Sequence, residues 1–583
     1  MTAPFLRSAL QRSTFLRLLP ALALAIVALP VSLTAQDRTH DQSGSQFYPG
    51  NLVVSRSVYD NRANNVTVGE PLPPDCAPST GGCVTAAYDG TYPTVFNNAP
   101  IDGSFGITSR IFLDQITPGG WPISTLEVAN SLERGVDADD DVLVTSFSSK
   151  SELALNLSLD KRYLTFMGYV APVNAIDVSN SNTPGAPDPT NPVGTNFYRA
   201  VATLDQQGRL TFTETNAYSG NNGRAAILNN VAGAHLFYTA GNAGNGANPQ
   251  PLNVDLGAGA QLIYPAYERE SEQAPPVPST PLASFSVTQL SDPADKIGKD
   301  DNFRGLNVYD NVVYFTKGSG GNGVNTVYFV DTTGSACPNG TGVPSASATL
   351  PTTPLSYTAS TVTTDGLPSN MCILSGFPTL SNKAKGANPV NFPFGVWFAN
   401  PTTLYVADEG DGSTSGVGTA FYTHAAAQTN AGLEKWVYDA TTKTWSMAYV
   451  LTNGLDLGTP YTVAGYPTGN NPGSANTSNP DGLPWSPATD GLRNITGKVN
   501  RDGTVTIWAI TSTVSGAGDT GADPNKLVVI TDKLSDTTAA EAAGETFVTL
   551  RTARFGEVLR GISFTPGTGA GDDDHDWDGG FGW

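Results

Sequence analysis

The 583-residue sequence carries 52 acidic and 31 basic side chains, which gives a formal net charge of −21. A surface this acidic repels a phosphate backbone, so the charge argues against nucleic acid as a partner. The chain contains 62 glycines and 42 prolines, and only 14 % of its residues are charged. Short runs of Thr, Val, Tyr and Phe alternate with turn residues, which predicts an all-β protein with little helix.

Residues 1–35 have the pattern of a secretory signal peptide. Three arginines precede an apolar stretch from Leu18 to Leu33, and the small residue Ala35 offers a cleavage position. The stretch is short for a membrane span, and no later segment reaches the roughly 20 apolar residues that a span requires. We therefore expect a secreted, periplasmic or cell-surface protein with no membrane span after signal removal, and a retained anchor is the alternative.

Export would place the four cysteines in an oxidising compartment, where an even number favours disulfides. Of the three possible connectivities, we expect the local one, which joins Cys76 to Cys83 and Cys337 to Cys372. Each pair brackets a loop rich in Gly, Pro or Ser. The bridges would therefore fix insertions rather than a core.

A repeated pattern occupies most of the chain: a polar or aromatic residue, a short strand, a turn and a second apolar strand. The six copies begin at Glu152, Arg224, Arg304, Phe394, Arg493 and Arg560. Further strands lie between the copies, so that each repeat has the four strands of a propeller blade. We predict a single β-propeller over residues 36–566 with six blades, or seven if an insertion conceals one.

The last copy has no partner strand after it. Strands predicted at 51–59, 110–116 and 124–128 would complete this blade, so that both ends of the chain close the ring and remove its exposed edges. Long loop insertions separate the strands, at 60–106, 172–195, 241–281, 333–391 and 453–489. Insertions of this length are binding elements or disordered decoration. The acidic, low-complexity tail 567–583 is expected to be disordered.

The first residues of the six copies form the first candidate site. Innermost strands line the channel of a propeller, so these residues are expected to form a ring at one end of it. Four members are arginines, whose guanidinium groups bind carboxylate or phosphate through paired hydrogen bonds. The set is Arg224, Arg304, Arg493 and Arg560, completed by Glu152 and Phe394. It predicts a site for an anionic small molecule or an acidic peptide end, and the alternative is a structural ring in which carboxylates and carbonyls satisfy each arginine.

Acidic turn residues form the second candidate site. Asp408, Glu409 and Asp411 follow a predicted strand that would place them at the same end as the arginines. Calcium prefers oxygen ligands of this kind, so calcium is the one cofactor that the sequence suggests. The acidic run 137–141 and the tail offer similar ligands without the spacing of an EF-hand. Solvated turn carboxylates are the alternative interpretation.

Catalytic motifs are scarce. The sequence contains no Gly-x-Ser-x-Gly, His-Glu-x-x-His or Walker-type segment, and its four histidines are scattered. We therefore predict a monomeric, non-enzymatic module that binds an anionic small molecule, a polymer or a protein. The alternative is a calcium-assisted hydrolase of the lactonase or phosphoesterase type.

Two phrases carry a family resemblance. Residues 404–410, Leu-Tyr-Val-Ala-Asp-Glu-Gly, resemble the strand-and-turn phrase of NHL-type and gluconolactonase-like six-bladed propellers. Residues 158–164 are similar to the inner hairpin of many bacterial propellers, and the whole mature chain resembles a group of exported bacterial proteins to which no activity is assigned. The resemblance implies the propeller fold. It does not transfer the lactonase calcium ligands, because no matching acidic set stands at the first positions of the inner strands.

Overall fold

The structure is a computed structural model, and all of its described residues belong to one compact unit, Gly44–Trp583. The described ranges are 46–59, 71–72, 84–85, 106–128, 143–184, 196–242, 259–265, 281–287, 302–319, 323–337, 339–355, 369–380, 391–415, 418–470, 482–517 and 520–570. The predicted signal peptide, Cys76, Cys83, the acidic run 137–141 and tail residues 571–583 lie outside them. Residues 567–570 are described and form a turn, in which the Gly567 N–H donates to the Lys161 carbonyl (2.7 Å).

The described ranges are mostly β-structure, as the composition predicts. They contain one α-helix, α1 (Ala420–Ala427), and three short 3-10 helices at Val178–Asn180, Thr520–Ala522 and Glu541–Gly544. No helix in these ranges is both long and apolar enough to cross a membrane.

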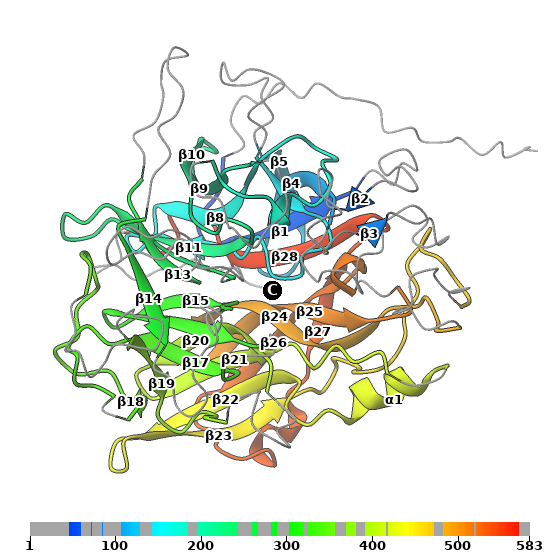
Figure 1. Ribbon diagram of the computed structural model, residues 1–583. Helices are drawn as coiled ribbons and strands as arrows, with labels where there is room; N and C mark the ends of the chain where they lie inside the picture. Colours follow the sequence, from blue (N-terminus) through cyan, green and yellow to red (C-terminus); the bar gives the residue numbers. More distant parts are fainter. Residues whose placement is uncertain are drawn as a thin grey trace, which may run out of the picture. The chain divides into compact units, whose positions relative to one another are not determined.

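The first large sheet has nine strands and joins the two ends of the chain. Its order is β10-β9-β8-β6-β4-β1-β28, with β5 paired to β4 and β7 paired to β8. The bounds are β1 (Leu52–Val58), β4 (Thr108–Ile116), β5 (Pro122–Glu127), β6 (Leu143–Ser146), β7 (Asn156–Leu157), β8 (Tyr163–Val170), β9 (Arg199–Asp205), β10 (Leu210–Thr215) and β28 (Glu557–Phe564). β1 and β28 pair antiparallel, with Leu52 opposite Phe564, and lie side by side in Figure 1.

The second large sheet also has nine strands, in the order β11-β12-β13-β14-β19-β17-β16-β15, with β18 paired to β19. Its strands are β11 (Gly223–Asn229), β12 (Leu236–Gly241), β13 (Ala260–Ile263), β14 (Ala283–Val287), β15 (Leu306–Tyr309), β16 (Val312–Lys317), β17 (Thr326–Val330), β18 (Thr341–Gly342) and β19 (Ser369–Leu374). Most pairs are antiparallel, whereas β19 lies parallel to β14 and to β18.

Two four-stranded sheets follow in simple chain order. One contains β20 (Pro393–Asn400), β21 (Thr403–Asp408), β22 (Gly432–Asp439) and β23 (Thr444–Leu451), and the other contains β24 (Ala488–Val499), β25 (Thr504–Val514), β26 (Lys526–Lys533) and β27 (Val548–Thr552). A separate two-stranded sheet pairs β2 (Pro71–Leu72) with β3 (Val84–Thr85). The four large sheets are arranged as a propeller-like ring (Figure 1).

Backbone segments approach closely where neighbouring inner strands meet. A Cβ atom on Gly395 would lie 2.6 Å from the Arg493 carbonyl oxygen, and one on Gly561 would lie 2.6 Å from the Leu155 nitrogen. Real side chains do not tolerate such distances, so glycine at these positions lets the strands pack. The hydroxyl of Ser55 on β1 also donates to the Leu153 carbonyl (2.8 Å).

The predicted bridge between Cys337 and Cys372 is present and is confirmed. It ties the loop that follows β17 to β19, with the two Cα atoms 6.0 Å apart. Asp331 organises the same loop, because its carboxylate accepts hydrogen bonds from the backbone N–H groups of Thr333 (2.8 Å) and Ala336 (2.9 Å). This bridge therefore fixes an insertion, as the sequence predicts.

The close approach at Gly561 predicts a stability effect. Gly561→Ala forces a methyl group against the backbone of Leu153 and Leu155, so we expect a loss of about 1–3 kcal/mol in the free energy of unfolding, measured by urea denaturation. Gly544→Ala is the matched control, because a Cβ atom there meets nothing within 4 Å. Equal stability of the two variants would contradict the close approach of these strands.

Candidate functional site

A tight turn directly after β21 positions the central acidic residue, Glu409. The Asp408 carboxylate holds the turn by accepting hydrogen bonds from the backbone N–H groups of Phe392 (2.5 Å) and Gly410 (2.9 Å). Gly410 has a φ of +75°, and a Cβ atom there would lie 2.6 Å from the Asp490 carbonyl oxygen, so glycine is required. The backbone of Glu409 is fixed as well: its N–H donates to the Phe392 carbonyl (3.0 Å), and its carbonyl accepts from the Ser512 hydroxyl (2.6 Å).

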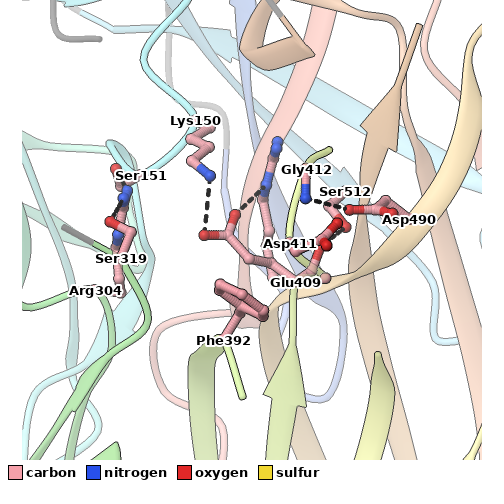
Figure 2. Close-up of polar contacts among 12 residues, drawn as sticks. Lys150, Ser151, Arg304, Ser319, Phe392, Glu409, Asp411, Gly412, Asp490 and Ser512 are labelled. Atoms are coloured by element: carbon pink, nitrogen blue, oxygen red, sulfur yellow. Dashed lines mark hydrogen bonds and ion pairs between the residues drawn. The ribbon is translucent and has the colours of Figure 1, made fainter. Parts of the chain in front are cut away.

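The Glu409 carboxylate contacts two cationic side chains. Its Oε1 lies 3.0 Å from Nζ of Lys150, and its Oε2 lies 3.3 Å from Nε of Arg493. Figure 2 shows the carboxylate pointing toward Lys150. Burial alone would raise the pKa of Glu409, but the charges of Lys150, Arg304 and Arg493 outweigh burial and lower the pKa to about 2. Glu409 is therefore ionised at neutral pH.

Two further arginines, Arg304 and Arg224, interact electrostatically with Glu409. Arg304 donates to the hydroxyl groups of Ser151 and Ser319, and Arg224 donates to the Asn302 side chain and to the Phe303 carbonyl (2.7 Å). Burial lowers the pKa of both guanidinium groups, and like charges lower them further: Arg304 acts on Arg224, and Arg493 acts on Arg304. We call Lys150, Arg224, Arg304 and Arg493 the cation cluster.

Two donors of the cation cluster have no acceptor among the residues that the structure describes. The Nε atoms of Arg224 and Arg304 are buried and have no hydrogen-bond partner in the described part of the chain. A buried donor left without an acceptor costs free energy, and a charged one costs more than a neutral one. Solvent reaches the cluster at Lys150, whose side chain is 34 % exposed.

The six residues predicted as a ring have different surroundings. All four arginines are buried, at 2–5 % exposure. Arg304 acts electrostatically on Arg224, Arg493 acts on Arg304, and the ring of Phe394 lies 5.8 Å from Cζ of Arg304. Arg560 donates to the hydroxyl of Ser57 (3.2 Å) and to the carbonyl of Phe147.

Glu152 is satisfied by neutral groups. Its carboxylate accepts hydrogen bonds from the Thr145 hydroxyl (2.7 Å), the Ser146 N–H (2.9 Å), the Tyr169 hydroxyl (2.5 Å) and the Asn222 amide (3.3 Å). Its negative charge opposes the lowering of the Arg224 pKa. Glu152 therefore contributes charge to the cluster without an ion pair to it within the described residues.

The three acids predicted as calcium ligands have separate partners. Asp408 accepts from backbone N–H groups, Glu409 binds Lys150 and Arg493, and Asp411 lies 2.6 Å from Nε2 of His424. Within the described ranges, one group of three His, Cys, Asp or Glu residues has its ligand atoms within 4.8 Å of one another: Asp331, Cys337 and Cys372. The sulfur atoms of that group are bonded to each other, so it does not offer two thiolates to a metal ion. Calcium binding at Asp408, Glu409 and Asp411 stays a prediction.

A second buried carboxyl, that of Asp490, also holds the Glu409 turn. Asp490 accepts hydrogen bonds from the Gly412 N–H (2.9 Å) and from the Gln428 amide (2.6 Å). Burial raises the pKa of Asp490 and of Asp408 to about 7 each. The turn that presents Glu409 is thus held by two carboxyls that titrate near neutral pH.

Sequence reasoning missed Lys150 and the role of Glu409 as a counter-ion. Lys150 stands two positions before Glu152, at the start of the first repeat, so its place beside the inner strands was the available signal. It also missed Arg199, which is fully buried and donates to the main-chain carbonyls of Phe197, Ser179, Ser181 and Asn221. Arg199 shows how this fold satisfies a buried guanidinium group through main-chain carbonyls, without an ion pair among the described residues.

Comparison with known proteins gives no family. No protein-family model and no curated protein matches the chain. Among solved structures, a putative 6-phosphogluconolactonase from Bacteroides uniformis is similar at a TM-score of 0.31 and 10 % identity, over 76 % of this chain and 78 % of that one. A putative phosphatase from Bacteroides thetaiotaomicron is similar at a TM-score of 0.26 and 12 % identity, over 70 % of each chain. A Synechocystis apocarotenoid oxygenase mutant is similar at a TM-score of 0.30 and 9 % identity, over 90 % of this chain and 94 % of that one. These scores are low, so the fold assignment depends on the strand pairings and the activities of these proteins carry no argument for this chain.

Removing the charge of Glu409 should destabilise the fold. Glu409→Gln leaves the buried guanidinium groups without their shared counter-ion, so we expect a loss of about 3–5 kcal/mol in the free energy of unfolding. Glu127→Gln is the control, because its partner Arg110 is 54 % exposed. An exposed ion pair of this kind contributes about 0–1 kcal/mol. A loss at Glu409 no larger than that at Glu127 would contradict its role as counter-ion.

Asp490 should make stability depend on pH near neutrality. Because its pKa is raised to about 7 from the ordinary value of 3.8, the folded chain keeps a proton that the unfolded chain releases between these pH values. The stabilisation from this proton is complete in acid and is lost as the pH rises to about 7. Asp490→Asn removes this titration, so the stability advantage of the wild type over the variant should narrow by on the order of 2–3 kcal/mol between about pH 5 and about pH 8.

Asp502→Asn provides the control for the pH experiment. Hydrogen bonds from Thr504 lower the pKa of Asp502 below 3.8, so its titration ends below the range tested. Its stability difference from the wild type should be constant across the range. Parallel curves for the wild type and Asp490→Asn would contradict the raised pKa of Asp490.

Proposed function

We propose that this chain is an exported, six-bladed ligand-binding propeller whose cation cluster binds a small anion. The proposal combines a finer division of the sheets, the excess of positive charge at the cluster and the two guanidinium Nε atoms that lack acceptors among the described residues. The last of these observations carries it.

Six blades account for the strand pairings. Each nine-stranded sheet divides into two blades, and each four-stranded sheet forms one blade. The six blades are then β28-β1-β4-β5, β7 to β10, β11 to β14, β15 to β19, β20 to β23 and β24 to β27, and β6 bridges the first two. In this division the pairing of β1 with β28 closes the ring with strands from both ends of the chain.

Contacts between successive inner segments support the same count. The Ala154 N–H donates to the Arg224 carbonyl (3.2 Å), and Arg224 donates to the Phe303 carbonyl (2.7 Å). The Thr316 hydroxyl, beside Gly305, donates to the Phe394 carbonyl, and Gly395 packs on the Arg493 carbonyl. The Asn494 amide donates to the Arg560 carbonyl (2.8 Å), and Gly561 packs on the Leu153 carbonyl. This circuit returns to its starting strand after six segments.

The charge distribution at the cluster suits an anion. Four cationic side chains face two nearby carboxylates, those of Glu409 and Glu152, and Glu152 is already satisfied by neutral donors. The Nε atoms of Arg224 and Arg304 still lack acceptors in the described part of the chain. A carboxylate or phosphate oxygen is the acceptor that guanidinium groups bind best. An anion there would lower the cost of burying these like charges together.

Thermal unfolding with added anions tests the proposal. Inorganic phosphate, sulfate and citrate should be titrated into the wild type and into the double variant Arg304→Gln/Arg493→Gln. A ligand that binds only the folded state stabilises it by about 2.7 kcal/mol at a concentration of 100 Kd. We expect at least one anion to stabilise the wild type in this way and to have no such effect on the double variant.

Arg199→Gln is the matched control, because Arg199 is a buried arginine held by main-chain carbonyls and Glu409 is not among the charges that act on its pKa. It should lower stability and keep the response to the anion. If no anion stabilises the wild type and the double variant only loses stability, the cluster is structural and the proposal is wrong. Turnover of lactones or phosphate esters that stops when calcium is chelated would instead favour a calcium-assisted hydrolase that uses Asp408, Glu409 and Asp411.

A further inference from the structure

A cavity of about 300 Å³ lies along the inner strands, next to the cation cluster in sequence but lined by different residues. Its lining starts one position after several of the predicted ring residues, at Gly305, Gly395 and Asn494. None of the ring residues themselves lines it. Its size is at the small end of the range for ligand sites, which suits a single small molecule.

The polar lining consists almost wholly of neutral groups. Among the lining residues only Lys161 is ionisable, and it lies on an exposed turn. The other polar lining side chains are Asn156, Ser158, Asn307, Asn494, Thr496 and Ser563, besides the indole of Trp397. A charged ligand would therefore enter this cavity without a buried counter-ion, which is costly.

Three of the polar residues are asparagines with the same hydrogen-bonding arrangement. The Nδ2 atom of each donates to the main chain of another inner segment: Asn156 to the Ala226 carbonyl (3.2 Å), Asn307 to the Val396 carbonyl (3.2 Å) and Asn494 to the Arg560 carbonyl (2.8 Å). These bonds fix the amide planes. The Oδ1 atom of each amide accepts no hydrogen bond from the described residues, so three residues that line the cavity each keep an acceptor for a ligand.

The remaining wall is apolar. The indole of Trp397 packs on Gly497, where a Cβ atom would lie 2.8 Å from the ring, and its N–H has no partner within the described ranges. Leu306 and Ile495 line the cavity beside it. A ligand for this cavity therefore needs several hydroxyl donors, an acceptor for the indole N–H and an apolar carbon surface.

We propose that this cavity binds one neutral, polyhydroxylated ring of monosaccharide size. The hydroxyl groups donate to the oxygens of Asn156, Asn307 and Asn494, and the carbon surface packs against Trp397 and Leu306. Sugars combine these two surfaces, and aromatic side chains pack on their apolar faces. The site is independent of the anion proposed for the cation cluster, because the two sets of residues do not overlap.

Isothermal titration calorimetry of the full chain with glucose, galactose, mannose and N-acetylglucosamine tests this inference. We expect one of these sugars to bind with a dissociation constant in the millimolar range or tighter, at about −4 kcal/mol or better. Asn307→Leu removes one oriented oxygen and should weaken that binding roughly tenfold, the loss expected for one hydrogen bond. Thr496→Trp places a large side chain at a half-buried lining position and should abolish binding.

Asn453→Leu is the control. The Asn453 amide also donates to main-chain carbonyls, those of Ala543 (3.4 Å) and Glu545 (3.3 Å), but it is exposed and does not line the cavity. It should leave the sugar affinity unchanged, and circular dichroism should show that all three variants are folded. The inference is overturned if none of the four sugars binds the wild type, or if binding persists in folded Thr496→Trp. Because Arg304→Gln/Arg493→Gln alters only the cation cluster, sugar binding should survive in that variant even where anion binding is lost.

Discussion

The contacts of the Glu409 carboxylate with Lys150 and Arg493 are the interactions on which the charged centre of this protein depends. Burying several guanidinium groups near one another costs free energy through desolvation and through mutual repulsion. One ionised carboxylate, that of Glu409, offsets much of this cost. The attraction between this carboxylate and the cations also lowers its pKa. Because Nε atoms of Arg224 and Arg304 still lack acceptors in the described structure, this compensation is incomplete.

The turn that positions Glu409 is held by two acids whose carboxyl groups have higher pKa values than that of Glu409. Asp408 and Asp490 hold the turn through backbone N–H groups, and burial raises the pKa of both. Glu434 on β22 is a third acid with a raised pKa. Burial and the charge of Asp408 raise the pKa of its carboxyl well above the usual range. Asp408, Asp490 and Glu434 thus resist ionisation, whereas Glu409 is ionised. The contrast arises because Glu409, unlike these three acids, forms ion pairs with Lys150 and Arg493.

Much of the strand pattern could be predicted from the sequence, because it depends on local signals. The alternation of apolar strands and turns predicts hairpins such as β20 with β21 and β24 with β25, and the structure has them. The bridge between Cys337 and Cys372 follows from an even cysteine count and local spacing. Helix α1 was not predicted, since its alanine-rich segment lies in a Gly/Ser-rich loop and shows no apolar periodicity.

The partners of the candidate site could not be predicted in the same way. Whether Glu409 meets a metal ion or a lysine depends on Lys150, which is 259 positions away in the chain. The repeat alignment places arginines at matching positions. It cannot predict that Arg560 donates a hydrogen bond to Ser57 whereas Arg493 forms an ion pair with Glu409. Such choices depend on loop conformations between repeats, which vary from one repeat to the next and leave no periodic signal in the sequence.

A crystal structure of the protein soaked in selenate, with anomalous diffraction measured at the selenium edge, tests the central claim most directly. The account predicts an anomalous peak at the cation cluster, with selenate oxygens about 2.7–3.0 Å from Nε of Arg224 or Arg304. A map with no peak there, in which protein side chains or carbonyls occupy those acceptor positions instead, would contradict it.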